Sequence, residues 1–149
     1  MTHFSSRLLL LFFLSISTVV FAHGFCPSYS ELKYDTAGNM VADTHNDHIG
    51  LHWQSPHHAL TTTPLLSVAF EGAAVSALQP SLGYRAVACD YHVVYSAVGH
   101  PEQDIVLMPI DYHAFAIDPQ DQGAWSGVGD PATCKSKTAL KACPFTTVV

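Results

Sequence analysis

The sequence predicts an all-β protein, either a small β-sandwich or an open barrel of about seven short antiparallel strands, with at most one short helical turn near the C-terminus. Three observations lead to this prediction. Apolar and polar residues alternate over short stretches, turn-forming residues separate these stretches, and no segment carries a sustained apolar stripe with the 3.6-residue period of a helix.

The first half of the chain contains four candidate strands. Each is a short run of strand-forming residues, and turn-forming residues lie after the first, third and fourth runs. The turn at residues 36–39 predicts that the first two strands form a hairpin. We expect Ser55-Pro56 to end the third strand and Gly72 to end the fourth. The four strands cover residues 31–35, 40–42, 49–53 and 66–71.

The second half contains the clearest strand, residues 84–97, which is rich in Val, Tyr and Ala. A turn at residues 99–102 and an apolar run at 104–109 predict that this strand continues into a second hairpin. Residues 112–117 alternate again. A Gly-rich loop follows, and residues 138–141 are expected to form the single helical turn.

Residues 1–22 have the layout of a cleavable secretory signal, with a short polar start that contains Arg7, an apolar run and a cut after Ala22. The alternative is a membrane anchor, but the apolar run of about 14 residues is shorter than the roughly 20 that a spanning helix needs. The sequence therefore predicts a single secreted β domain at residues 23–149, in the periplasm or outside the cell, with no membrane span.

The four cysteines, Cys26, Cys89, Cys134 and Cys143, all follow the predicted cut. An even number of cysteines in a short exported chain predicts two disulfides, for which three pairings exist. Cys134 and Cys143 are close in sequence, which favours a Cys134–Cys143 bond and leaves Cys26 to pair with Cys89. A zinc site would be expected to contain C-x-x-C pairs, and the chain has none.

The charge of the chain argues against nucleic acid and anionic membranes as partners. After loss of Arg7, five Lys or Arg residues face twelve Asp or Glu residues, which gives a net charge of −7. Nine of the ten histidines remain, so the surface charge either responds to pH or simply reflects frequent use of His as a polar residue.

One candidate metal site lies in the turn that contains His45, Asp47 and His48. Imidazole and carboxylate ligands at this spacing suit zinc, copper or nickel. The alternatives are adventitious metal binding and a plain solvated turn.

A second candidate metal site is the predicted new N-terminus. After cleavage His23 would offer a free amine and an imidazole, which hold copper in a histidine brace when a second imidazole joins them; His92 or His113 would supply it. In this respect the chain is similar to lytic polysaccharide monooxygenases and small periplasmic copper carriers. The alternative is that Cys26 alone explains this N-terminus.

The loop at residues 118–130 offers Asp118, Asp121 and Asp130 as oxygen ligands for calcium, although their spacing fits no EF-hand. In the same loop, Trp125 between glycines either presents its ring to a ligand such as a sugar or covers an edge of the core. The plain alternative for the aspartates is an acidic loop.

Several short segments follow one another in a recognisable order. They are Cys26-Pro27, a short hairpin, Trp53-Gln54-Ser55, the apolar strand around Phe70, Cys89-Asp90-Tyr91, a second hairpin and the closing Cys134 to Cys143-Pro144-Phe145. In this order they resemble a family of small exported β domains of unknown function from Gram-negative gammaproteobacteria, which includes secreted proteins of intracellular pathogens. The resemblance spans most of the predicted mature chain and implies a compact β fold with two disulfides, but no catalytic residues.

The sequence contains no G-x-S-x-G, H-E-x-x-H or phosphate-binding glycine motif. We therefore expect a non-enzymatic, effector-like secreted module that needs no cofactor and binds a protein or a glycan through loops on a rigid scaffold. The alternative is a copper protein that uses His23, either as a carrier or as an oxidoreductase.

Overall fold

The computed structural model describes residues 22–46, 49–56, 63–76, 86–110, 114–117, 125–126, 132–136 and 140–148. The described residues confirm the all-β prediction, because they form antiparallel strands and two single-turn 3₁₀ helices. The predicted secretory signal lies outside the described residues, apart from Ala22, the first residue of β1.

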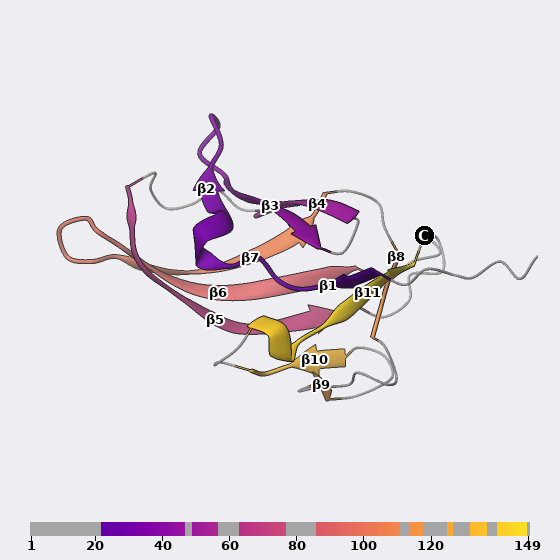
Figure 1. Ribbon diagram of the computed structural model, residues 1–149. Helices are drawn as coiled ribbons and strands as arrows, with labels where there is room; N and C mark the ends of the chain where they lie inside the picture. The colour runs from indigo at the N-terminus through magenta and orange to yellow at the C-terminus, as the bar shows by residue number, and fades with distance from the viewer. Residues whose placement is uncertain are drawn as a thin grey trace, which may run out of the picture.

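A curled sheet of eight strands forms a half-barrel, and a small sheet of three strands lies against it (Figure 1). The strand order in the large sheet is β2-β3-β4-β7-β6-β5-β10-β9, and every pair is antiparallel. Its strands are β2 (Leu32–Tyr34), β3 (Met40–Asn46), β4 (Ile49–Gln54), β5 (Leu65–Val75), β6 (Val87–Tyr95), β7 (Glu102–Pro109), β9 (Trp125–Ser126) and β10 (Ala132–Cys134).

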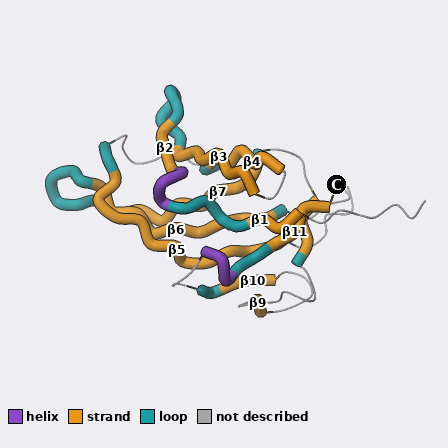
Figure 2. The backbone as a smooth tube through the Cα atoms, viewed as in Figure 1, coloured by secondary structure: helices purple, strands orange, loops and turns teal. Residues whose placement is uncertain are grey.

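The small sheet joins the two ends of the described chain. Its order is β1-β11-β8, with strands β1 (Ala22–Gly24), β8 (Ala114–Ala116) and β11 (Phe145–Val148). The two 3₁₀ turns are η1 (Tyr29–Glu31) and η2 (Leu140–Ala142), drawn as helices in Figure 2. The C-terminal turn was expected at residues 138–141, whereas η1 was not expected.

The alternating pattern of β6 produces one buried face and one outward face. Val87, Cys89, Tyr91, Val93 and Tyr95 are all buried, and the residues between them are partly exposed. β6 is the strand that the sequence predicts most clearly, and it lies near the middle of the large sheet between β5 and β7. Its period-two pattern therefore decides which face of the sheet carries the core.

Aromatic side chains fill the space between the two sheets. Phe145 of β11 is fully buried, and its ring makes edge-on contacts with Trp53 at 6.0 Å and with Phe115 at 5.6 Å between ring centroids. The indole N–H of Trp53 donates to the hydroxyl of Thr44 at 2.9 Å, so the polar atom of this core ring is satisfied.

β5 is longer than the sequence predicts, because it continues through Gly72 to Val75. The register of β5 against β6 shifts between Phe70 and Gly72, as at a β-bulge. A Cβ at Gly72 would lie 2.5 Å from the carbonyl oxygen of Cys134. The glycine therefore permits a close approach of β10 to β5, and the prediction that it ends the strand is wrong.

Both disulfides have the pairing that the sequence favours. Cys26 is bonded to Cys89, which ties the segment after β1 to the inner face of β6. Cys134 is bonded to Cys143, which ties the end of β10 to the segment before β11. The structure therefore excludes the other two pairings and a zinc site at these cysteines.

The described residues form more strands than the seven or so expected, and the additional ones are short. β1, β9, β10 and β11 have two to four residues each, which is too short for an alternating pattern to be detected in the sequence. Other expected strands differ from the observed ones mainly at their ends.

Candidate functional site

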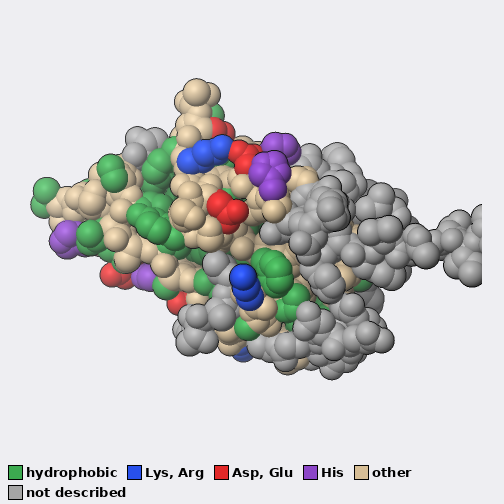
Figure 3. Space-filling model, viewed as in Figure 1, with side chains coloured by type: hydrophobic (Ala, Val, Ile, Leu, Met, Phe, Trp, Pro, Cys, Tyr) green, Lys and Arg blue, Asp and Glu red, His purple; other side chains and the backbone are tan. Residues whose placement is uncertain are grey.

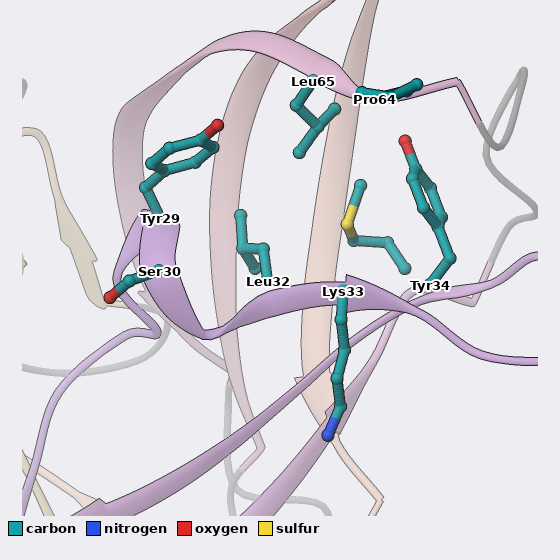
Figure 4. Close-up of a pocket in the computed structure, with 8 residues that line it drawn as sticks. Tyr29, Ser30, Leu32, Lys33, Tyr34, Pro64 and Leu65 are labelled. Atoms are coloured by element: carbon teal, nitrogen blue, oxygen red, sulfur yellow. The ribbon is translucent and has the colours of Figure 1, made fainter.

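The curled sheet does not close, and a groove lies where its edge strand β2 approaches the start of β5. We call it the seam groove, and its volume is about 360 Å³, within the range of roughly 300–1,000 Å³ that is typical of ligand sites. Residues from η1, β2, β3 and the start of β5 line it (Figure 4): Tyr29, Ser30, Leu32, Lys33, Tyr34, Met40, Pro64 and Leu65.

Two tyrosines form opposite sides of the seam groove, and apolar side chains lie between them (Figure 4). Tyr29 is 56% exposed although it is a large aromatic residue. Met40 is almost fully buried, and Leu32 and Leu65 are packed against the core. The floor of the groove is therefore part of the hydrophobic core, which keeps its shape fixed.

The position of Tyr29 is fixed by contacts on its own turn and on the segment before it. The backbone N–H and the hydroxyl of Ser28 both donate to Glu31 Oε2, at 2.6 and 2.7 Å, and close the turn as a capping box does. One residue earlier, the carbonyl oxygen of Pro27 accepts a 2.6 Å hydrogen bond from the Tyr91 hydroxyl. Burial raises the pKa of Tyr91, so this hydroxyl keeps its proton and stays a donor.

Tyr34 bridges the two sides of the seam. Its hydroxyl donates to the carbonyl oxygen of Thr63 at 3.2 Å, just before β5 begins. Burial, with a smaller effect of the neighbouring Tyr95, raises the pKa of Tyr34, so the phenol stays neutral over the physiological range. The bridge therefore holds β2 near β5 without backbone pairing between them.

The inside of the seam groove carries no charged group among the described residues. Lys33 is the one charged residue that lines it, and its ammonium points away from the groove (Figure 4) and pairs with Asp43. Asp35, in the turn after β2, accepts hydrogen bonds from Asn39 and Ala37, and the bonds to Asn39 are the main reason that its pKa is lowered. The charges near the groove are thus compensated within the protein.

Lys33 and Asp43 belong to a row of interacting polar side chains that continues to His52. Asp43 lies directly opposite His52 across β3 and β4, and His52 Nδ1 is 2.5 Å from Asp43 Oδ1. The hydrogen bond from Lys33, and then that from His52, lowers the pKa of Asp43. Figure 3 shows basic, acidic and histidine side chains gathered near the top of this face of the molecule.

A second groove, of about 460 Å³, lies on the outward face of β5, β6 and β7, and it is acidic. Glu71, Asp90, His92 and Asp104 are among the residues that line it. His92 Nδ1 is 2.8 Å from Asp104 Oδ1, and His92 Nε2 is 3.4 Å from Glu102 Oε2. The hydrogen bond to Asp104 is the main cause that raises the pKa of His92, whereas burial is the main cause that raises the pKa of Asp90.

The structure places only part of the predicted metal-binding turn. His45 is exposed on β3, opposite Gly50 of β4, whereas Asp47 and His48 lie outside the described residues. Within the part of the chain that the structure describes, no three His, Cys, Asp or Glu side chains are grouped so that they could hold a metal ion.

The predicted copper site at the N-terminus is only partly described. The backbone of His23 belongs to β1 and lies opposite Thr146, while its side chain and the whole of His113 are outside the described residues. Cys26, three residues along, is bonded to the inward face of β6. His92 projects from the opposite face of β6, so the structure does not bring His92 and the N-terminal strand to one face. Copper binding at His23 stays a prediction.

Trp125 faces inward. It is 7% exposed, and its indole N–H donates to the carbonyl oxygen of Pro144 at 2.7 Å. A ring placed in this way covers an edge of the core and offers little of its surface to a ligand. Asp118, Asp121 and Asp130, from the same loop, lie outside the described residues.

Sequence reasoning missed the residues of the seam groove, Tyr29 and Tyr34 above all. The only available signal was indirect, namely two tyrosines close to a short strand that was predicted to begin the sheet. The groove also needs Pro64 and Leu65, which are about thirty residues further along the chain. Only the curvature of the sheet brings these segments together.

Comparison of the chain with protein-family models, with curated proteins and with solved structures finds no match. The predicted family resemblance therefore stays a prediction.

The two disulfides are consistent with an extracytoplasmic protein. Among the described residues, no helix has the length and apolar character that crossing a membrane requires.

Proposed function

We propose that the chain is a secreted, non-enzymatic binding module that holds its ligand in the seam groove. The observation that carries this proposal is the concave, uncharged, tyrosine-sided surface whose floor belongs to the core of the half-barrel. Aromatic anchors around a rigid, partly apolar pocket are the features that give binding sites most of their affinity.

The exposure of Tyr29 supports this role. A tyrosine that is 56% exposed beside buried Met40 leaves apolar surface in contact with water, and covering such surface contributes roughly 25 cal/mol per Å². Because η1 is held by the capping box and by the Cys26–Cys89 bond, little backbone freedom is lost when a ligand binds beside Tyr29. The site is preorganised in this sense.

The proposal of export is supported by the predicted signal at residues 1–22 and by the two disulfides, because disulfides form and persist in oxidising compartments. In such a compartment the module would meet ligands outside the cytoplasm. The resemblance of the sequence to exported domains of gammaproteobacteria also supports the proposal of export.

The test is a binding screen of the oxidised protein against two probes, a glycan array and a library of random peptides displayed on phage. Tyr29→Ala removes one side of the groove. Ile110→Ala is the matched control, because Ile110 is also 56% exposed but does not line the groove. We expect a ligand whose binding weakens at least tenfold, or about 1.4 kcal/mol, in Tyr29→Ala and is unchanged in Ile110→Ala. Equal binding by the two variants, or no ligand from either probe, would overturn the proposal.

A further inference from the structure

The backbone of β2 directs hydrogen-bonding groups into the seam. In an antiparallel pair, successive residues alternate between those whose N–H and C=O bond to the partner strand and those whose groups point away from it. The N–H of Asp35 donates to Asn39 at 3.0 Å, so Lys33, two residues before it, also bonds towards β3. Leu32 and Tyr34 therefore turn their backbone groups to the open side of β2, apart from the Leu32 N–H, which donates within η1.

The carbonyl oxygen of Met40 confirms this alternation. Met40 lies opposite Tyr34, and its carbonyl accepts the N–H of Ser55 on the β4 side rather than bonding back to β2. Among the described residues, no strand pairs with the open side of β2. An edge strand of this kind has unpaired backbone N–H and C=O groups, with which an added strand can form hydrogen bonds.

The start of β5 faces the same seam with a second open edge. The N–H of Ser96 donates to the carbonyl of Pro64, while the N–H of Tyr95 donates to Pro101 on the β7 side. Leu65, which lies opposite Tyr95, therefore turns its backbone groups away from β6 and towards the seam. β10 pairs with β5 only from Ala73 to Val75, so this pairing does not reach Leu65. The seam groove thus has open backbone groups on two sides, from β2 and from the start of β5. Figure 4 shows the ribbons of these two segments on either side of the groove.

The chemistry of the groove selects an uncharged and apolar occupant. The side chains of Leu32, Met40 and Leu65 offer no hydrogen-bond partner to the many hydroxyls of a sugar, which would lose their hydrogen bonds to water on burial. The open backbone groups at the edges are spaced as in a β-strand and therefore match another strand. A charged side chain would lose hydration without meeting an opposite charge, because Lys33 is already paired with Asp43 outside the groove. A polypeptide backbone with apolar side chains matches both the open edges and the uncharged floor.

We propose that the seam groove binds an extended, uncharged, apolar peptide segment of a partner protein, which adds as a strand to the open edge of β2. This inference rests on the proposed function and names the ligand class for the same site. The bound segment presents every second side chain to the floor between Tyr29 and Tyr34, and its backbone bonds to Leu32 and Tyr34 on one side. The uncharged groove and the compensated charges around it are the electrostatic complement of such a segment.

A peptide with single backbone N-methyl groups tests strand addition directly. The probe is a ten-residue peptide selected from the phage library, and its affinity is measured by isothermal calorimetry with the oxidised protein. On its open side β2 offers the carbonyl oxygens of Leu32 and Tyr34 to the N–H groups of an added strand. We therefore expect a loss of roughly three- to tenfold at two peptide positions, two residues apart, and little change at the position between them. Losses without this alternation would overturn strand addition.

Two variants of Tyr34 provide the matched test on the protein. Tyr34→Ala removes the side chain but keeps the N–H, whereas Tyr34→Pro also removes the N–H that points to the open side. Proline is tolerated at such an edge position because it breaks no bond to β3, and circular dichroism checks that both variants fold. We expect the proline variant to bind the peptide at least threefold more weakly than the alanine variant. Equal affinities would overturn the inference.

The results also separate this inference from the proposed function. If only glycans bind, and Tyr29→Ala abolishes that binding, the groove is a ligand site but the peptide inference fails. If no probe binds, both fail. A peptide that binds equally well to Tyr29→Ala and to the unchanged protein lies outside the groove, and it likewise overturns the inference.

Discussion

The two disulfides should contribute unequally to stability, because they close loops of very different length. The loop between Cys26 and Cys89 spans 63 residues, and the loop between Cys134 and Cys143 spans 9. The entropy that each bond removes from the unfolded chain corresponds, at room temperature, to about 4.3 kcal/mol for the long loop and about 2.6 kcal/mol for the short one. We therefore expect loss of the Cys26–Cys89 bond to cost about 1.7 kcal/mol more.

The perturbation is replacement of each pair by alanine, Cys26→Ala with Cys89→Ala in one variant and Cys134→Ala with Cys143→Ala in the other. All four cysteines are at most 4% exposed, so the packing loss is similar in the two variants and largely cancels in the comparison. Guanidinium denaturation followed by the fluorescence of the buried Trp53 and Trp125 gives the free energy of unfolding.

Equal costs, or a larger cost for the short loop, would refute the loop-entropy argument. A change in the denaturant slope between the variants would show instead that the unfolded state or the cooperativity had changed. Since small domains are stable by only about 5–15 kcal/mol, the variant without the long loop should also be the one closest to unfolding at ordinary temperature.

Three further predictions concern single residues. The hydrogen bond to Asp104 raises the pKa of His92. The pair therefore stabilises the fold fully below the unfolded histidine pKa of about 6.5, and this stabilisation is lost as the pH rises through the folded pKa. As a result, His92→Gln should lower the urea midpoint relative to the unchanged protein at about pH 5 but not at about pH 8. Gly72→Ala should destabilise the protein by about 2 kcal/mol in urea denaturation, because its Cβ would lie 2.5 Å from a backbone carbonyl oxygen of β10. Thr44→Val should cost about 1–3 kcal/mol in thermal or urea unfolding, because it leaves the buried indole N–H of Trp53 without its acceptor.

Each of these substitutions has a control in the chain. Gly50→Ala also places a Cβ on a strand, but its nearest neighbour is a flexible His45 ring at 3.4 Å, so it should be much milder than Gly72→Ala. Thr44→Ser keeps the hydroxyl and should cost less than Thr44→Val. His100→Asn changes an exposed turn histidine that has no ion pair among the described residues, and an equal pH effect there would contradict the role given to His92.

The strands that the sequence predicted well are those whose alternation is long enough to be read. β6 and β7 lie within one residue or two of their expected ends where both are described, and β4 extends the expected 49–53 by one residue. Gly72 shows the limit of this reasoning. A glycine beside a strand ordinarily suggests an end, whereas here the approach of β10 from sixty residues away requires the missing side chain.

The candidate site could not be predicted in the same way. The histidines drew attention because their side chains carry recognisable chemistry, yet His52 and His92 lie directly opposite aspartates on neighbouring strands and are engaged there. Tyr29 and Tyr34 carried no such signal. Their importance comes from the seam that they border, and a seam is a property of the whole sheet.

By itself the sequence determined the all-β class, the main hairpins and the favoured disulfide pairing, because alternation, turn residues and cysteine spacing are local properties of the chain. Only the tertiary structure decided how far the sheet curls, which edges stay open and which side chains meet across the opening between β2 and β5. These features depend on the twist and register accumulated over many strand pairs, together with the packing of Phe145 and its neighbours between the sheets. Because these contributions come from the whole sheet, they cannot be predicted from any short segment of the sequence.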